Sequence, residues 1–102
     1  MRIPKKVKVG RTNYRIYTLK VGWMDKVGAM GEIDYDTKDI TIAARSSRKP
    51  HRKFSKEEMA DTFWHEITHA ILKDMNSKLH ANESFVTKFA NRLTTVISTA
   101  KF

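Results

Sequence analysis

Two histidines stand four residues apart in the stretch FWHEITHA, residues 63–70, and a glutamate directly follows the first of them. On an α-helix, positions four apart lie on one face, so the imidazoles of His65 and His69 can converge on a single ion. Imidazole nitrogen is a preferred ligand of Zn²⁺, and a neighbouring carboxylate can act as a general base. The spacing therefore predicts a zinc site, with Glu66 as the base.

Catalytic zinc needs a third protein ligand beside two histidines. Asp74 points about 140° away from His69 on the same helix and is a poor candidate. Two candidates remain, Glu83 and His80. Glu83 is favoured, because the short connection at residues 76–82 predicts antiparallel packing of two helices, which returns Glu83 toward the motif.

With these ligands, zinc would acidify its bound water and polarise a substrate carbonyl, while Glu66 would take the water's proton and pass it to the leaving amine. The pattern leaves the oxyanion stabiliser open among four side chains, Tyr35, Arg45, His51 and His80. An HExxH string also arises by chance in about one chain per few hundred of this length. On that interpretation, the histidines are ordinary surface residues.

The helix that must carry the motif has a clear start signal. Ser55 and Glu58 form the serine-x-x-glutamate capping box, which predicts a helix from this point to about Met75. A second helix is expected over about residues 82–99, because apolar residues recur there along one side.

The first 45 residues have the alternation typical of strands. Short alternating runs occur at residues 7–9 and 14–19, and residues 32–43 read as a hairpin that turns at residues 36–39. Strands followed by helices predict the α+β class. We expect one domain over residues 1–102, with a small antiparallel sheet of about three to four strands, then the motif helix and a second antiparallel helix.

Cysteine content and hydropathy indicate the cellular compartment in which the chain functions. The chain has no cysteine, which excludes a disulfide framework and a thiolate zinc site and suits a reducing cytoplasm. The opening residues lack the apolar run of a secretory signal, and no stretch approaches 18 apolar residues. We therefore expect a cytoplasmic protein without a membrane partner.

The net charge of +9 is unevenly distributed. Residues 1–20 contain seven Lys or Arg and residues 45–56 contain six, and neither segment contains an acid. Such segments could attract nucleic acid, or they could form a solvated basic surface. The alternative function is accordingly a basic nucleic-acid-binding accessory protein whose zinc site is structural or vestigial.

Three stretches in order give a resemblance that goes beyond the motif: KKVKVGRTNYRIY, GEIDYDTKDITI, and FSKEEMADTFWHEITHAIL followed by NESFV. Together they resemble the small phage and bacterial proteins of the ImmA/IrrE-like group of zinc metallopeptidases, within the gluzincin-type zincins. The resemblance implies a minimal zincin-like fold and an endopeptidase acting on a protein or peptide substrate in the cytoplasm of a bacterial or phage-infected host cell.

The resemblance also implies roles for individual residues. His65, His69 and Glu83 would be the zinc ligands and Glu66 the catalytic glutamate. In such enzymes a strand beside the active-site helix binds the substrate backbone by β-addition, and here that strand would be Asp39–Ala44.

Overall fold

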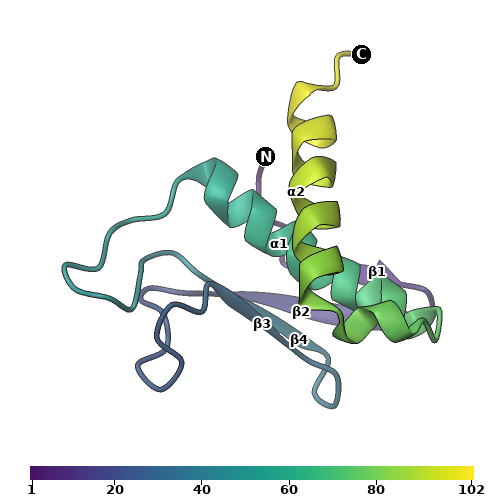
Figure 1. Ribbon diagram of the computed structural model, residues 1–102, viewed down its shortest axis with the longest axis horizontal. Helices are drawn as coiled ribbons and strands as arrows, with labels where there is room; N and C mark the ends of the chain where they lie inside the picture. The colour runs from purple at the N-terminus through teal and green to yellow at the C-terminus, as the bar shows by residue number, and fades with distance from the viewer.

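All 102 residues are described by a computed structural model. The elements are, in chain order, β1 (Lys6–Val9), β2 (Thr12–Leu19), β3 (Gly31–Asp34), β4 (Asp39–Ala43), α1 (Lys56–Asp74), the short 3-10 helix η1 (Lys78–Ala81) and α2 (Glu83–Thr99). Both long helices lie on the same side of the sheet (Figure 1). The α+β class, with a small sheet followed by two helices, is therefore confirmed.

The four strands form one sheet in the order β1-β2-β4-β3. β1 pairs with β2, and β3 with β4, in the antiparallel sense, but β2 and β4 run parallel. The sheet is thus mixed, and the predicted antiparallel sheet was wrong for this central pair. Burial explains the arrangement, because Ile40 and Ile42 of β4 are fully buried and gain cover from a strand on each side.

The core lies between one face of the sheet and α1. Alternate residues of the strands point toward the helix, as the period of two requires. The core comprises Val9, Tyr14, Ile16, Ile40 and Ile42 from the sheet, and Phe63, Ile67 and Ala70 from α1. This packing fixes the face of α1 that is turned away from the sheet.

The start of α1 has the expected capping box. The Ser55 hydroxyl accepts from the backbone N–H of Glu58, and the Glu58 carboxylate accepts from the backbone N–H of Ser55. Arg52 also donates two hydrogen bonds to that carboxylate and, with the capping bond, holds the pKa of Glu58 at about 2. The helix ends at Asp74, and Asn76 then adopts a left-handed conformation with φ of 56°. This reversal suits asparagine and turns the chain back toward α1.

The helix α2 packs back across α1 obliquely, so that its C-terminal end stands clear of the sheet (Figure 1). Its contact face consists of Val86, Ala90 and Thr94, which are all buried. The Thr94 hydroxyl donates to the Asp61 carboxylate of α1 at 3.1 Å. These contacts hold the first turn of α2, with Glu83, over the middle of α1. No helix is long and apolar enough to cross a membrane.

Candidate metal and catalytic site

The polar side of α1 lies in a cleft between β3 and α2. His69 is only 7% exposed and Glu66 only 5%, while His65 is partly exposed. The walls of the cleft cover most of this side of the helix. This burial removes water from the imidazoles and from the carboxyl group of Glu66, which disfavours their charged forms.

The structure brings His65, His69 and Glu83 together. The Nε2 atom of His65 lies 3.1 Å from one carboxylate oxygen of Glu83, and the Nε2 atom of His69 lies 2.8 Å from the other. One ligand atom from each residue lies within 4.8 Å of the other two. Two imidazole nitrogens and one carboxylate oxygen form a donor set that Zn²⁺ accepts, so these residues fit the metal that the sequence predicts.

A backbone carbonyl orients one of the two imidazoles. The Nδ1–H of His69 donates to the carbonyl oxygen of His80 at 2.6 Å. Since a carbonyl can only accept, this contact places a proton on Nδ1, so Nε2, which is directed at Glu83, is the nitrogen available to a metal. Of the two candidate third ligands, only Glu83 belongs to the cluster. The side chain of His80 lies outside it.

The surroundings of His65 favour the neutral form of its ring. Burial lowers the pKa of His65, partly opposed by the nearby carboxylate of Glu83. A neutral ring is the form that binds a metal. The carboxylate of Glu83 is 68% exposed, so an ion can reach the three donors from solvent.

The carboxyl group of Glu66 is buried and lies close to the backbone of β3. Burial raises its pKa to about 8, and the negative charges of Glu83 and Glu32 add to the effect. A side chain at Gly31 would collide here, because an added Cβ would lie 2.6 Å from Cγ2 of Thr62 and 3.0 Å from Oε2 of Glu66. Gly31 therefore lets the strand approach the catalytic candidate closely.

A cavity of about 410 Å³ opens beside this cluster. It is lined by β3, by the motif residues of α1 and by the segment that joins the two helices. Tyr35 and His80 also line it, and their rings meet edge to face with centroids 6.3 Å apart. Burial raises the pKa of Tyr35, with smaller contributions from Tyr14, Glu66 and Glu83, so its hydroxyl stays protonated and able to donate.

The other two oxyanion candidates lie away from the cavity. Arg45 and His51 belong to the loop after β4, where the Nδ1–H of His51 donates to the carbonyl of Ser46 at 2.9 Å. Asp74, set aside from its helical angle, points to the opposite end of the sheet, where its carboxylate lies against Gly10. Only Tyr35 and His80 remain from the predicted set of four.

The predicted substrate strand, Asp39–Ala44, was wrong. β4 is paired with β2 on one side and with β3 on the other, so neither of its edges can accept another strand. The free edge beside the cavity belongs to β3. Because the N–H of Ala43 donates to the carbonyl of Met30, alternation turns the backbone groups of Gly31 and Ile33 toward that free edge.

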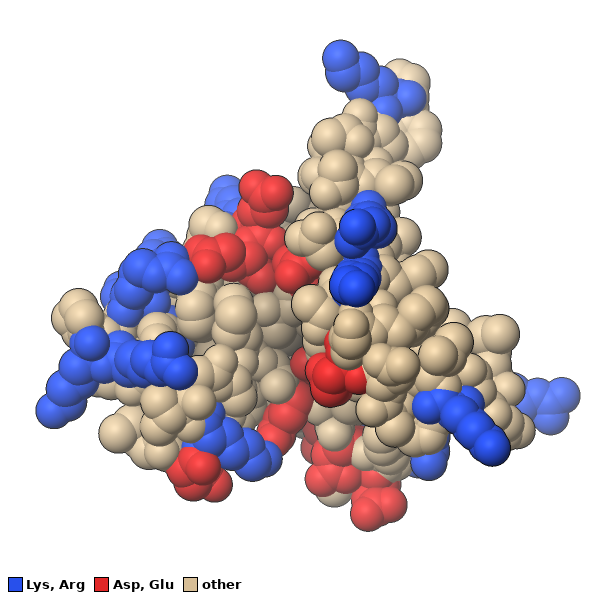
Figure 2. All heavy atoms as spheres, viewed as in Figure 1, with Lys and Arg blue, Asp and Glu red and all other residues tan.

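The site is acidic, whereas its surroundings are basic. Acidic side chains gather in the middle of the face shown in Figure 2, between the sheet and α2, while Lys and Arg lie mainly at the periphery. The chain as a whole carries a net charge of +9. The local negative field nevertheless favours entry of a cation at this cleft.

Two features of the site were missed from the sequence. Gly31 directly precedes the alternating run at residues 32–43, and a glycine at the start of such a run signals close backbone approach. The carbonyl of His80 carries no sequence signal, since every residue has a carbonyl group. Its role depends on where the chain turns between the two helices.

Comparisons with models of protein families, with curated proteins and with solved structures found no match. The resemblance to the ImmA/IrrE-like group therefore stays a prediction. Function is inferred below from the geometry of the site.

Proposed function

We propose that the protein is a zinc-dependent metallopeptidase of the ImmA/IrrE-like, zincin type, which hydrolyses peptide bonds of a protein substrate. The observation that carries this proposal is the convergence of His65, His69 and Glu83 on one point, next to the buried carboxyl group of Glu66. The absence of cysteine supports a reducing, cytoplasmic setting, and the resemblance adds a bacterial or phage-infected host cell to the proposal.

In this proposal, His65, His69 and Glu83 hold the metal, and Glu66 moves protons. Zinc bound in such a site supplies a Lewis acid that makes water reactive near neutral pH and polarises a carbonyl group. Glu66 takes the proton of the attacking water and delivers it to the amine that leaves. Its burial suits this role, because the raised pKa brings the carboxyl group close to the working pH.

The free edge of β3 supports an extended peptide as the substrate. The backbone groups of Gly31 and Ile33 point outward at this edge, and both residues line the cavity beside the metal ligands. A peptide added as a further strand would gain backbone hydrogen bonds without regard to its side chains. A cavity of about 410 Å³ accommodates a few side chains of such a segment.

Tyr35 is our choice for the group that stabilises the oxyanion. Its raised pKa keeps the hydroxyl protonated, so that it can donate to developing negative charge. Tyr35→Phe is expected to lower kcat about 100-fold or more while zinc per chain stays unchanged. An unchanged kcat would assign the role elsewhere.

The test of the proposal is to measure zinc per chain and peptide hydrolysis on the full chain, on Glu66→Gln and on Glu57→Gln as the matched control. Glu57 is exposed and lies in the first turn of the same helix. We expect about one zinc in all three proteins, with cleavage of a diverse peptide mixture, followed by mass spectrometry, lost only in Glu66→Gln. A parent chain that takes up no zinc, or a Glu66→Gln variant that still cleaves, would overturn the proposal.

A further inference from the structure

The outer face of β1 and β2 is a second surface, separate from the cleft. Neither helix covers this side of the sheet (Figure 1). Alternate residues point outward there, and the exposed ones are polar, charged or aromatic, whereas their neighbours in sequence face the helices. The exposed outward residues on the two strands are Lys6, Lys8, Asn13, Arg15 and Tyr17, and the half-buried Leu19 completes the alternation at the end of β2.

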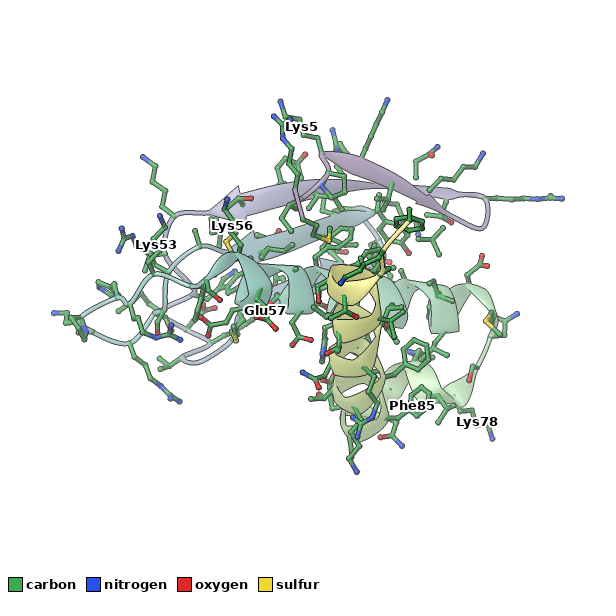
Figure 3. All side chains as sticks on the ribbon, turned by 90° about the horizontal axis from the view of Figure 1, so that it is seen from above. Lys5, Lys53, Lys56, Glu57, Lys78 and Phe85 are labelled. Carbon is green, nitrogen blue, oxygen red and sulfur yellow. The ribbon has the colours of Figure 1, made fainter.

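The register of the two strands concentrates positive charge on this face. Lys6 lies opposite Arg15, and Lys8 lies opposite Asn13. Neither lysine forms a salt bridge. Acids begin only at β4, where Asp39 meets Arg15 at 3.5 Å, and residues 1–20 contain none. In Figure 3, basic side chains, Lys5 among them, extend beyond the edge of the sheet formed by β1, which borders this face.

The two basic segments of the sequence meet at one end of this face. The parallel pairing of β2 and β4 brings their carboxyl ends together, and the N–H of Gly22 donates to the carbonyl of Arg45 at 2.9 Å. The basic loop after β4 therefore continues the positive strip that runs along β2. A nucleic-acid strand lying along β2 would meet Arg15 on that strand, Lys6 and Lys8 on the neighbouring β1, and the basic loop at its end.

An exposed aromatic ring lies within this strip. Tyr17 is 45% exposed, and the guanidinium carbon of Arg15 lies 5.9 Å from the centre of its ring. A planar ring beside a guanidinium group is a platform on which an unpaired base can stack. In a duplex the bases are already stacked on one another, so the ring of Tyr17 would find no free base face there. No other large apolar side chain is exposed on this face to enter a lipid layer.

We propose that the outer face of β1 and β2 binds single-stranded nucleic acid, with Tyr17 and Arg15 stacking on a base and Lys6 and Lys8 contacting phosphates. This interaction is independent of the peptidase, because none of these residues lies in the cleft. It would deliver the chain to substrates that are themselves bound to nucleic acid.

The test is fluorescence polarisation of a labelled oligothymidylate with the full chain, at salt concentrations between about 50 and 200 mM. With the two lysines on phosphates, a log–log slope of about −1.4 is expected, which is a loss of about 7-fold in affinity over that range. Tyr17→Ala should weaken binding at least about 5-fold without changing the slope, and Tyr17→Phe should bind like the parent. If Tyr17→Ala binds like the parent, the stacking proposal is wrong.

Variants that remove two positive charges distinguish binding at a defined surface from binding that depends only on the net charge of the chain. Lys6→Gln/Lys8→Gln should reduce the slope by about 1.4, whereas Lys88→Gln/Lys101→Gln, which removes the same charge from exposed positions at α2 and beyond, should change little. Equal effects of the two pairs would overturn the proposal. Tighter binding to a duplex of the same length, or binding only to vesicles of phosphatidylserine and phosphatidylcholine, would also overturn it. Glu66→Gln should bind the oligonucleotide like the parent, so a failed peptidase assay does not affect this result.

Discussion

Glu66→Gln should stabilise the metal-free protein above about pH 5, although it removes the proposed catalytic base. In the folded chain the pKa of Glu66 is raised from 4.5 to about 8, chiefly by burial. Between these two values the unfolded chain has already released the proton that the folded chain retains. The unfolded state therefore binds fewer protons, and the free energy of unfolding falls as the pH rises.

The magnitude follows from the two pKa values. At 1.36 kcal/mol for each pH unit between 4.5 and about 8, the loss reaches about 5 kcal/mol above pH 8 and about 3 kcal/mol at pH 7. A small domain has a total stability of only about 5–15 kcal/mol, so the effect is large. Glutamine has nearly the same shape as the protonated carboxyl group and cannot ionise, so the variant avoids this loss.

The assay is urea unfolding of the metal-free protein, prepared with a chelator, at several values between about pH 5 and pH 9. The parent should lose stability steadily, and Glu66→Gln should change much less. The control is Glu57→Gln, the same substitution at an exposed position of α1. Parallel curves for the parent and Glu66→Gln would refute the reasoning, because they would show that Glu66 ionises in the folded chain as it does in the unfolded chain.

Three further predictions concern the same cleft. Glu83→Ala should reduce zinc per chain from about one to near zero in elemental analysis. His80→Ala should retain zinc, because the backbone carbonyl that orients His69 survives the change. Loss of zinc in His80→Ala but not in Glu83→Ala would make His80 the third ligand. Gly31→Ala should destabilise the fold by about 1–3 kcal/mol in thermal unfolding, because its methyl group would collide with Thr62. Adding Thr62→Ser, which removes the colliding methyl group, should recover part of this loss. If the two substitutions have additive effects on stability, the two side chains are not in contact. Ile33→Pro removes an N–H at the free edge of β3 without breaking a bond to β4, so KM for peptides should rise while zinc content stays the same; an unchanged KM would place the substrate elsewhere.

The helix that carries the motif was predictable because its determinants are local. The capping box of Ser55 and Glu58 marked its start, and the observed helix begins at Lys56 and ends one residue before the predicted Met75. A helix repeats every 3.6 residues whatever surrounds it, so the shared face of His65 and His69 was also determined by sequence spacing. The hairpin of β3 and β4 was predictable for the same reason, since its turn and alternation lie within a dozen residues.

The strand order could not be read in this way. The alternation of β4 shows that it is a strand, but not which strands pair with it. That choice depended on burying Ile40 and Ile42 from both sides, which involves residues more than twenty positions away in β2. The same nonlocal choice made β3 the free edge and invalidated the substrate strand inferred from the sequence.

The sequence by itself determined the chemistry available to this protein, namely two imidazoles and a carboxyl group on one turn of a helix, no thiolate, and an excess of positive charge. Only the tertiary structure decided how these groups combine. It brought Glu83 onto the histidines, turned the carbonyl of His80 to His69, and buried Glu66 against Gly31. The physical reason is that helical spacing is set by hydrogen bonds four residues apart, whereas convergence and burial are set by packing between elements distant in the chain.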